Sequence, residues 1–396
     1  QPRNKKTMHT KKRLLTPGPT PLPEKVRLAL ARDMLHHRKT DFRSIYQKTQ
    51  HKLQQLFATE QPVLTLSCSG TGAMQAAVNN LFAPGEKVLI ASAGKFGQRW
   101  TDLARHRNLD VRHLSLPWGE AFNARQIQEI LNQNPDVSGL LLQASETSTG
   151  VLHPIREIAD LTRKQDVLLV VDGISTVGIS PCPLDEWGID CLLTASQKGL
   201  MLPPGLGLIS LSEKAWQKVA QTAPRDYYFD LLLEKESCLK GQTRFTSPVN
   251  LILGLDAALE IFFEQGLENI YRKHWALTQM VRAGIKSLGL ELFAPEHYTW
   301  GLTSIHLPSG IDSRQLLGKA HSDYGVIFAG GQDRLKNRLV RIGHMGHVDF
   351  ADLLAGLYAL RKSYLSCGGF SGSENYLEVA LEAYEQALGN FKRPQP

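Results

Sequence analysis

Seven short apolar runs alternate with helix-like segments between residues 60 and 212, and this alternation constrains the fold most strongly. Each run is continuously apolar, which is typical of strands buried on both faces of a parallel sheet. Segments such as Ala73–Leu81, Ala124–Asn132 and Ile155–Lys164 fit crossover helices. The pattern predicts an α/β, doubly wound fold with a mainly parallel sheet covered by helices. The expected strands are Val63–Ser67, Val88–Ala91, Val111–Leu114, Gly139–Gln143, Val167–Asp172, Cys191–Ser196 and Leu206–Leu211.

Beyond Pro248 the pattern changes to longer helices and fewer strands, which predicts a smaller α+β domain. We divide the chain into a basic N-terminal arm (1–13), a large domain (14–268) and a small C-terminal domain (269–396). A Gly/Ser-rich stretch at 368–373 is expected to be flexible. The expected strands here are Thr303–Leu307 and Leu339–Ile342, and the helices are Asn250–Gln265, Ile270–Leu288, Ser313–His321, Phe350–Tyr364 and Glu374–Leu388.

Composition excludes several classes of protein. Of the 396 residues, 42% are hydrophobic and 21% charged, as in ordinary globular proteins. No apolar stretch approaches 18 residues, so we expect no membrane partner. The net charge of +7 reflects a basic N-terminus, but no groove-reading motif follows it, so we expect no nucleic-acid partner. The five scattered cysteines form no CxxC pair, which argues against a metal site and favours a cytoplasmic location, with organellar targeting left open.

Polar residues follow three of the apolar runs and are candidates for a functional site. Ser69-Gly70-Thr71-Gly72 precedes a helix and is either an anion cup or a plain tight turn. Asp172 ends a strand, where ligands bind in open parallel sheets, and would hold a metal, a ribose or a protonated ring nitrogen, or cap the next helix. Lys198 follows another strand and is either a desolvated nucleophile or a surface lysine. Together they fit the phosphate, ring nitrogen and aldehyde of pyridoxal phosphate.

At these residues the chain resembles the class V pyridoxal-phosphate aminotransferases of fold type I. It is most similar to the alanine–glyoxylate and serine–pyruvate branch, whose bacterial relatives are sometimes labelled a soluble hydrogenase subunit. The matching stretches span residues 14–362 in the family's order. They are Leu15-Thr16-Pro17-Gly18-Pro19-Thr20, Ser69-Gly70-Thr71-Gly72-Ala73-Met74, Gly94-Lys95-Phe96-Gly97-Gln98-Arg99, Glu146-Thr147-Ser148-Thr149-Gly150, Val171-Asp172, Ser196-Gln197-Lys198-Gly199, Thr246-Ser247-Pro248-Val249 and Arg341-Ile342-Gly343-His344-Met345-Gly346.

The resemblance implies roles for these residues around pyridoxal 5'-phosphate. Lys198 would form the internal aldimine and then move protons during transamination. Asp172 would pair with the pyridinium nitrogen, and Phe96, where many relatives have Trp, would stack on the ring or be a plain core aromatic. Thr147 would contact the phenolic oxygen of the cofactor ring. The phosphate would be held by Ser69, Gly70, Thr71 and Gln197, and by Thr246 of the other subunit, which implies a homodimer.

The resemblance also implies a substrate site. Arg341 would bind the α-carboxylate with two parallel hydrogen bonds, rather than pair with a structural acid. Gly18, in the matching N-terminal stretch, would be the other substrate-binding residue. No unambiguous second cation is present, although Arg38 and Arg244 are candidates. We therefore expect alanine or serine as amino donor and glyoxylate or pyruvate as acceptor, with an aspartate-using enzyme of the same family as the alternative.

At two segments, the roles known in the family do not transfer directly to this chain. Relatives often have Tyr three residues before the phosphate-binding Thr, but here that position is Thr243, and Arg244 would compensate or be solvated. His36-His37-Arg38 resembles a segment near the active-site entrance of bacterial relatives, and a helix-end polar cluster is the alternative. We expect His344 to be structural or to support the site from outside.

Two other functions remain less favoured. A cysteine desulfurase or other lyase on this fold would place His before the lysine, where this chain has Gln197, and would need a loop cysteine. Cys367 is loop-like but lacks the Ser/Ala-rich surroundings of that family. A non-catalytic binding module is opposed by the presence of Lys198, Asp172 and Arg341 together.

Overall fold

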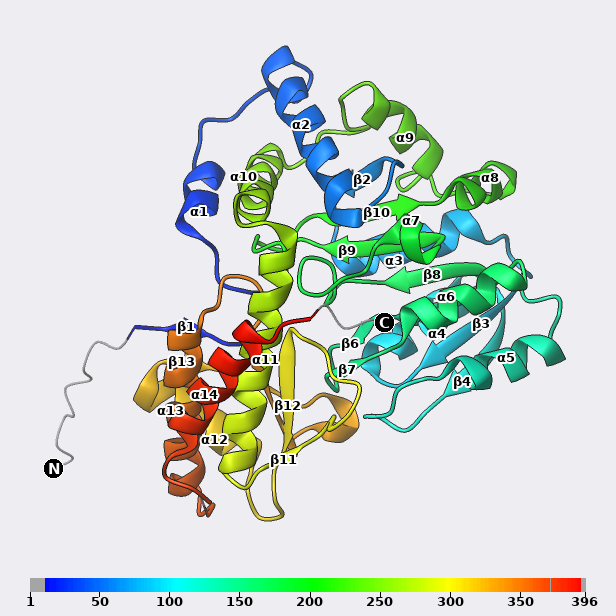
Figure 1. The fold of residues 1–396 in the computed structure, drawn as a ribbon. Helices are drawn as coiled ribbons and strands as arrows, with labels where there is room; N and C mark the ends of the chain where they lie inside the picture. Colours follow the sequence, from blue (N-terminus) through cyan, green and yellow to red (C-terminus); the bar gives the residue numbers. More distant parts are fainter. Residues whose placement is uncertain (1–10, 371, 393–396) are drawn as a thin grey trace, which may run out of the picture.

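A computed structural model describes residues 11–370 and 372–392. Within these residues, a seven-stranded sheet forms the centre of the larger part of the molecule (Figure 1). Its strand order is β2-β10-β9-β8-β5-β3-β4. The strands are β2 (Val63–Leu66), β3 (Lys87–Ser92), β4 (Asp110–Ser115), β5 (Gly139–Gln143), β8 (Leu168–Asp172), β9 (Cys191–Ala195) and β10 (Gly207–Leu211).

The sheet is mainly parallel, which confirms the predicted fold class. Each pair from β9 through β8, β5 and β3 to β4 is parallel. Only β10 runs the other way, because the segment 196–206 returns the chain from β9 without a crossover helix, and it pairs antiparallel with both β9 and β2. The carboxyl ends of the parallel strands therefore lie together at one edge of the sheet.

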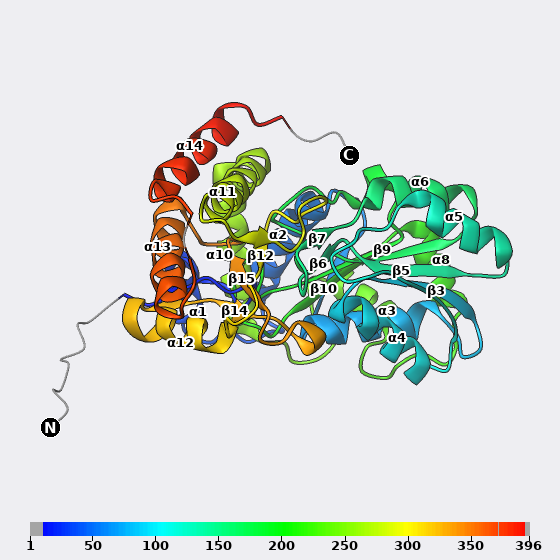
Figure 2. The same cartoon turned by 90° about the horizontal axis from the view of Figure 1, so that it is seen from below.

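Helices cover both faces of this sheet, as Figure 2 shows from below. The helices α3 (Gly70–Leu81) and α4 (Lys95–His106) lie on one face, and α5 (Ala124–Gln133) and α6 (Ile155–Lys164) lie on the other. Other helices of this part are α1 (Glu24–Leu30), α2 (Thr40–Phe57), α7 (Leu184–Trp187), α8 (Glu213–Gln221), α9 (Leu231–Leu239) and α10 (Val249–Gln265). The short hairpin β6 (Ser145–Glu146) with β7 (Val151–Leu152) follows β5.

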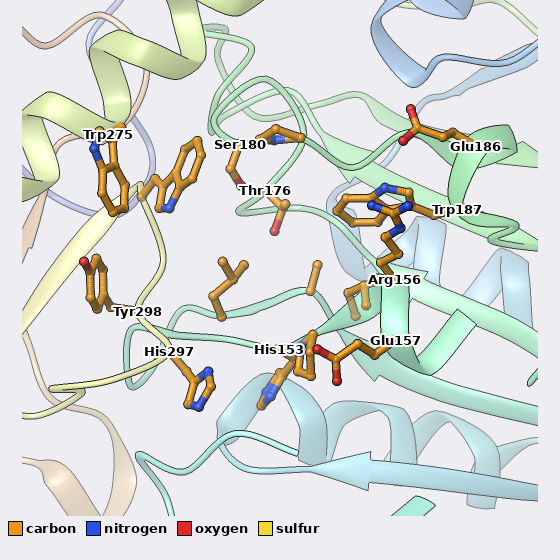
Figure 3. A pocket seen from close by; sticks show the side chains of 16 residues that line it. His153, Arg156, Glu157, Thr176, Ser180, Glu186, Trp187, Trp275, His297 and Tyr298 are labelled. Atoms are coloured by element: carbon orange, nitrogen blue, oxygen red, sulfur yellow. The ribbon is translucent and has the colours of Figure 1, made fainter. Parts of the chain in front are cut away.

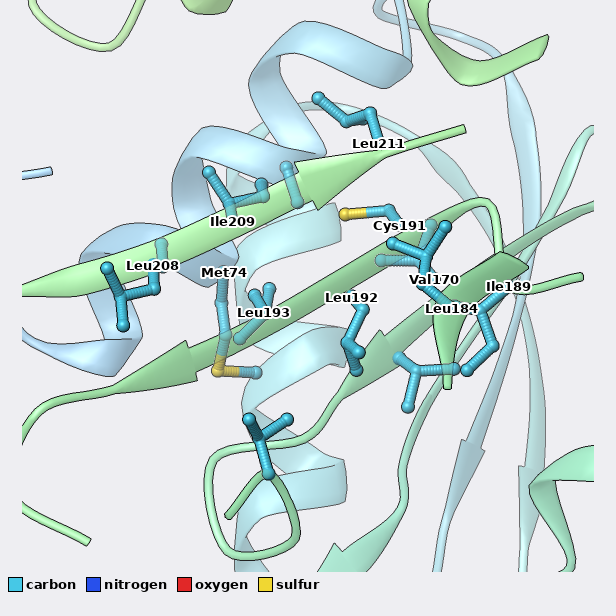
Figure 4. Close-up of a cluster of buried hydrophobic side chains, with 14 of the residues drawn as sticks. Met74, Val170, Leu184, Ile189, Cys191, Leu192, Leu193, Leu208, Ile209 and Leu211 are labelled. Carbon is cyan, nitrogen blue, oxygen red and sulfur yellow. The ribbon is translucent and has the colours of Figure 1, made fainter. Parts of the chain in front are cut away.

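The largest hydrophobic cluster fills the space between the sheet and its helices. Figure 4 shows its centre, where α3 packs against β9 and β10. Because both faces of these strands are covered, their side chains are buried at every position, which accounts for the uninterrupted apolar runs of the sequence. Buried side chains drawn there include Met74, Val170, Leu184, Ile189, Cys191, Leu192, Leu193, Leu208, Ile209 and Leu211.

The C-terminal part has its own sheet and its own core. Its strand order is β11-β12-β15-β14, and long helices pack against it (Figure 1). Its hydrophobic cluster also takes in Leu15, because β1 pairs with β13. The boundary at residue 268 stays a prediction. The elements are α11 (Leu267–Ser287), α12 (Ser313–Tyr324), α13 (Phe350–Ser366), α14 (Tyr376–Gly389), β1 (Arg13–Leu14), β11 (Glu291–Leu292), β12 (Leu302–His306), β13 (Val326–Ile327), β14 (Ala329–Gly330), β15 (Leu339–Gly343) and the 3-10 turn Asp333–Leu335.

Some local expectations differ from the structure. Helix α3 begins at Gly70 and not at Ala73, so the glycines of the predicted cup belong to its first turn. Helix α11 begins at Leu267, directly after Gly266. Most of the basic arm, 1–10, and residue 371 of the Gly/Ser-rich stretch lie outside the described residues. Within the described ranges, no helix combines the length and apolar character needed to cross a bilayer.

Candidate active site

The carboxyl ends of β8 and β9 place the two central residues of the site. Asp172 is the last residue of β8, and Lys198 follows the end of β9 by three positions. These strands are parallel neighbours, with Asp172 paired to Leu193. Asp172 is buried and Lys198 is partly buried. The fold therefore brings the predicted acid and lysine to the same edge of the sheet, as ligand sites of open α/β sheets require.

The N-terminal segment forms a wall against Lys198. The Lys198 Nζ donates a hydrogen bond to the Pro17 carbonyl oxygen. Gly18 has φ +108°, and a Cβ built there would lie 2.5 Å from Lys198 Cδ and 2.7 Å from Nζ. A side chain at position 18 would therefore occupy the space of the lysine chain, and its backbone would be strained as well. Gly18 shapes the lysine's surroundings, although no substrate contact is defined by this geometry.

Burial shifts the pKa values of both central groups toward neutrality. Desolvation lowers the pKa of Lys198 to about 8, with further lowering by the positive charge of Arg341, while Asp172 acts in the opposite direction. Desolvation raises the pKa of Asp172 to about 7, opposed first by the hydrogen bond from the Ile174 N–H. The two residues therefore each retain a substantial neutral fraction near pH 7–8, which is typical of groups that exchange protons or bind a counter-ion from a ligand.

The first turn of α3 presents unoccupied donors beside the same edge. Ser69 is the N-cap residue, and its side chain makes no capping hydrogen bond. The hydroxyl of Thr71 accepts a hydrogen bond from Arg99 Nη1 at 2.9 Å. A Cβ at Gly70 would lie 2.4 Å from Ile174 Cδ1, so glycine allows α3 to approach the loop after β8. Backbone N–H groups, a positive helix end and Arg99 together fit an anion such as phosphate.

A buried carboxylate holds the start of α4, on which Phe96 stands. Glu146 accepts hydrogen bonds from the backbone N–H of Phe96 at 3.1 Å and of Gly97 at 2.9 Å. It also accepts bonds from the N–H and hydroxyl of Ser148. Phe96 is partly exposed, and the Arg99 guanidinium lies 4.9 Å from its ring centroid. The aromatic face predicted to stack on a ring is thus held on the capped end of a helix.

Arg341 connects the C-terminal sheet to the turn of the β6–β7 hairpin. It lies on β15 and donates from Nε and Nη2 to the Gly330 carbonyl at 3.0 and 2.8 Å, and from Nη1 to the Thr147 carbonyl at 2.9 Å. Burial lowers the pKa of Arg341 to about 10, and Glu146 opposes this lowering. The hydroxyl of Thr147 in turn bonds the Ser175 hydroxyl at 2.6 Å. Arg341 is positioned by backbone carbonyls of both parts of the chain, and one N–H on each terminal nitrogen is left for a ligand.

The remaining predicted residues lie around this centre or at the surface. Gln197 precedes Lys198, and its buried Oε1 has no hydrogen-bond partner among the described residues. Thr246 is exposed and lines a surface hollow together with Ser69 of its own chain. A role of Thr246 in another subunit stays a prediction.

The two candidate second cations make other contacts within this chain. Arg38 donates to the Gln242 side chain and to the carbonyls of Thr243 and Arg244. The guanidinium of Arg244 stacks on the rings of Tyr227 and Phe245. His36 and His37 stack on each other, with ring centroids 4.9 Å apart.

His344 is buried among protein partners. It bonds the Thr303 hydroxyl at 3.0 Å and the Trp300 carbonyl at 3.2 Å, and desolvation lowers its pKa to about 3. A neutral, fully bonded imidazole fits the expected structural role. Within the part of the chain that the structure describes, no group of three or more His, Cys, Asp or Glu side chains is arranged to hold a metal ion.

Sequence reasoning gave no role to three residues of this site, namely Arg99, Glu146 and Ser175. Arg99 lies one helical turn after Phe96, and this spacing was a usable signal. Glu146 stands in a stretch, 144–151, in which every residue is buried, and a charged residue in such a stretch requires partners. Ser175 follows Asp172 in the strand-end loop, but the sequence carries no sign of its contact with Thr147.

Comparisons with known proteins agree with this geometry. The family model described as Aminotransferase class-V matches residues 24–344. An L-aspartate–glyoxylate aminotransferase of Paracoccus denitrificans is 34% identical, covering 94% of this chain and 98% of that protein. A serine–glyoxylate aminotransferase of Methylorubrum extorquens is 33% identical, covering 92% of this chain and 95% of that protein.

The fold comparison leads to the same family. The crystal structure of a pyridoxamine–pyruvate aminotransferase from Mesorhizobium loti superposes with a TM-score of 0.92 at 26% identity, over 96% of this chain and 98% of that one. The family model covers residues of both parts of the molecule, including Asp172, Lys198 and Arg341. The chain belongs to the class V aminotransferase family and is an enzyme that transfers amino groups between amino acids and oxo acids.

Proposed function

We propose that the enzyme uses pyridoxal 5'-phosphate bound at the edge formed by β8, β9 and the start of α3. The observation that carries this proposal is the placement of a desolvated lysine, Lys198, and a buried acid, Asp172, at the ends of neighbouring strands. Each retains an incomplete set of partners, which is the state expected of groups that a ligand completes. The proposal agrees with the family to which the chain belongs.

The residues present fit the cofactor on three further observations. The α3 N-terminus, with an uncapped Ser69, supplies donors for a phosphate. Gln197 directly precedes the lysine, and its side-chain NH₂ group can donate to a phosphate oxygen. Gly18 leaves free the volume that Lys198 needs to reach across the site. Ser69, Gly70, Thr71 and Gln197 would hold the phosphate, Asp172 the ring nitrogen and Thr147 the phenolic oxygen, with Phe96 against the ring face.

When bound, pyridoxal phosphate supplies an electron sink for the carbanion formed at the substrate's α-carbon. The lowered pKa of Lys198 keeps part of its amine unprotonated near neutral pH, so its Nζ can act as a nucleophile and then accept and return a proton. Asp172 places a negative charge at the end of β8, where it holds a proton on a ring nitrogen. The Pro17 carbonyl and Gly18 orient the lysine chain between these tasks.

Arg341 is proposed to bind the substrate α-carboxylate. Three of its N–H groups are fixed on the Gly330 and Thr147 carbonyls, so the guanidinium plane is set before a substrate arrives. One N–H on each terminal nitrogen is then available, which matches the two oxygens of a carboxylate. Arg38 donates hydrogen bonds to the segment 242–244, and Arg244 lies over the rings of Tyr227 and Phe245. Neither is therefore assigned to a distal carboxylate. We therefore favour alanine or serine as donor and glyoxylate or pyruvate as acceptor.

An aspartate-using enzyme is the second candidate, and two observations favour it. A relative at 34% identity is named for L-aspartate and glyoxylate. Arg99 also places a guanidinium near Phe96, on the side of the site where a ring would stack. Its hydrogen bond to Thr71 argues instead for a place beside the phosphate, so we keep the small neutral donors as the main proposal.

A half-reaction screen tests function and substrate separately. The protein loaded with pyridoxal phosphate is mixed with alanine, serine, aspartate or glutamate, one at a time, and the conversion of the cofactor to its amine form is followed by absorbance. We expect conversion with alanine and serine, none in Lys198→Ala, and normal conversion in Lys164→Ala, an exposed lysine on α6. A preference for aspartate or glutamate would overturn the substrate proposal, and no conversion with any amino acid would overturn the function.

We further propose a homodimer in which Thr246 faces the phosphate of the partner subunit. Thr246 is exposed, and large apolar side chains are exposed around it: Met34 and Thr246 line a second surface hollow, and Tyr227 contacts Phe245, the residue before Thr246. Met34 is 71% and Tyr227 79% exposed, and a gathering of exposed apolar side chains on one surface is typical of a protein–protein contact. Sedimentation should give a dimer at assay concentration, and an active monomer would contradict the proposal. The cytoplasmic location stays a prediction from the cysteine pattern.

A further inference from the structure

The turn that follows β8 carries two neighbouring hydroxyl side chains, Ser175 and Thr176. Each of them is only 1% exposed. The turn starts at Asp172 and is closed by a hydrogen bond from the Thr176 N–H to the Gly173 carbonyl at 2.9 Å. The backbone therefore fixes both hydroxyls relative to the acid that is proposed to hold the cofactor ring.

The two hydroxyls bond to different partners. Ser175 Oγ lies 2.6 Å from Thr147 Oγ1, whereas Thr176 Oγ1 donates to Ser145 Oγ at 2.8 Å. Ser145 in turn bonds the Thr299 hydroxyl of the C-terminal part at 3.0 Å. All five side chains are buried. Two separate hydroxyl networks thus start from adjacent residues of one turn.

Thr176 belongs to the wall of a separate cavity, which Figure 3 shows from close by. The same wall includes Trp275 and Tyr298, whereas neither Asp172 nor Ser175 lines this cavity. Thr176 therefore matches Ser175 in burial, in backbone setting and in chemistry, but its surroundings differ. It is a suitable reference residue for a test of Ser175.

The contact between Thr147 and Ser175 leaves one hydroxyl proton over. Each hydroxyl carries one proton, and the two oxygens share a single hydrogen bond. Neither oxygen makes another hydrogen bond within residues 11–370 and 372–392. Both protons are used when Ser175 donates to Thr147 and Thr147, the more exposed of the two at 5%, donates to a further acceptor. A buried pair of this kind is complete only when such an acceptor lies beside Thr147.

The backbone around Thr147 is already fixed, so the direction of its hydroxyl is what remains to be set. The Thr147 carbonyl accepts a hydrogen bond from Arg341 Nη1 at 2.9 Å. The preceding residue, Glu146, is held by the N–H groups at the start of α4. The contact with Ser175 therefore determines where the Thr147 proton points.

We propose that Ser175 is a positioning residue of the reaction, whose hydroxyl donates to Thr147 and so directs the Thr147 proton at the phenolic oxygen of the cofactor ring. The inference rests on the proposed function, in which Thr147 contacts that oxygen. A donor at a phenolic oxygen favours its ionised form, and hydrogen bonds in a chain strengthen one another. The turn after β8 thus acts on the ring at two places, through Asp172 and through Ser175.

The charged groups of the site come from five different segments and stay in place when a hydroxyl is removed. They influence one another's pKa values, which marks them as neighbours. A change caused by the loss of one hydroxyl can therefore be assigned to that hydroxyl. The groups are Glu146 on β6, Asp172 on β8, Arg99 on α4, Lys198 after β9 and Arg341 on β15.

A pH titration of the visible absorbance band of the cofactor-loaded enzyme, without substrate, tests the proposal. Losing a donor disfavours the ionised phenolic oxygen, so the midpoint of the titration should move to higher pH. We expect a rise of about 0.7 pH unit in Thr147→Val, the equivalent of one net hydrogen bond. Ser175→Ala should raise the midpoint by about 0.3 pH unit, because support from a neighbouring bond is a fraction of a bond. Thr176→Val is the matched control and should leave the midpoint unchanged.

The double variant tests whether Ser175 acts through Thr147. Ser175→Ala should add no shift in the Thr147→Val background, because the path from Ser175 to the ring is then absent. Additive shifts would contradict this path, and a larger shift in Ser175→Ala than in Thr147→Val would mean that Ser175 itself contacts the ring. Ser175→Cys keeps a weak donor and should shift the midpoint less than Ser175→Ala, which provides a second variant should the alanine variant not fold.

The same titration separates this inference from the proposed function. A wild-type enzyme that shows no visible band with pyridoxal phosphate would overturn the proposed function and, with it, the inference. A wild-type band that titrates normally, with an unmoved midpoint in Ser175→Ala or an equal shift in Thr176→Val, would overturn the inference alone.

Discussion

Two buried carboxylates lie close to each other in this enzyme, and their surroundings differ. Glu146 accepts hydrogen bonds from the N–H groups of Phe96, Gly97 and Ser148 and from the Ser148 hydroxyl. Asp172 receives one such bond, from the Ile174 N–H at 2.8 Å. Burial raises the pKa of both carboxyls, but the four bonds at Glu146 oppose the effect, whereas the pKa of Asp172 rises to about 7.

The difference separates a structural acid from one kept for a ligand. Glu146 occupies the N-terminal end of α4, where a carboxylate satisfies free N–H groups and complements the helix dipole. The N-terminal end of α3 has no such group, and Asp172 nearby has few partners of its own. Burial alone therefore does not identify a functional acid. The number of protein donors that already satisfy it is the better guide.

Among the variants proposed here, the one that removes the charge of Asp172 should lower the reaction rate most. Asp172→Asn keeps the size of the side chain but loses the negative charge proposed to hold a proton on the cofactor ring. We expect the rate of α-proton removal to fall about 10³-fold, as when a preorganised electrostatic partner is lost, with cofactor still bound. Stopped-flow absorbance of the half-reaction measures this rate. An unchanged rate would show that Asp172 is not the ring partner.

The pH dependence of stability should also reveal the raised pKa of Asp172. Its folded pKa lies above its ordinary value of 3.8, so the folded chain without cofactor holds a proton that the unfolded chain releases between pH 4 and 7. The stability contributed by this proton is full below pH 4 and is lost as pH rises through 7. The advantage of Asp172→Asn over the wild type should therefore grow from pH 5 to pH 8, toward ~4 kcal/mol. Urea denaturation at each pH measures it, and a constant difference would contradict the shift.

Arg341→Lys changes a residue proposed to bind the substrate, whereas Asp172 is proposed to bind the cofactor. A lysine keeps the charge but loses the planar fork, so the Michaelis constants for donor and acceptor should both rise. A kcat/KM reduced about 30-fold or more is expected, since losing a desolvated charged pair is worth roughly 2–5 kcal/mol. Cofactor affinity serves as the control and should stay the same. Unchanged Michaelis constants would remove Arg341 from the substrate site.

Glu146→Gln should affect stability more than chemistry, with the smallest kinetic change of the series. The amide oxygen can replace only one carboxylate oxygen, and the amide NH₂ would face the backbone donors of α4. We expect a loss of about 1–3 kcal/mol in the free energy of unfolding, the effect of leaving a buried donor unpaired. Chemical denaturation measures this loss. A half-reaction rate reduced as strongly as in Asp172→Asn would erase the distinction between the two acids.

The sequence predicts the strand ends well and the contacts between loops poorly. Asp172 and Lys198 follow long apolar runs, and the geometry of a parallel sheet then places both at one edge. The start of α3 was expected three residues late, because glycines at 70 and 72 weaken a helical pattern although they allow close approach to neighbouring segments. The role of Glu146 depends on α4, whose start at 95–97 includes Gly97, and on a hairpin with strands of two residues. Such contacts arise from tertiary packing and leave no periodic signal.

The most direct test of the central claim is to locate the covalently held cofactor. The enzyme is incubated with pyridoxal phosphate, reduced with borohydride, digested and mapped by mass spectrometry. The account predicts a cofactor adduct on the peptide that carries Lys198, and none on Lys273, a second partly buried lysine whose pKa burial lowers to about 8. An adduct on Lys273 or on any other lysine, with Lys198 unmodified, would contradict it.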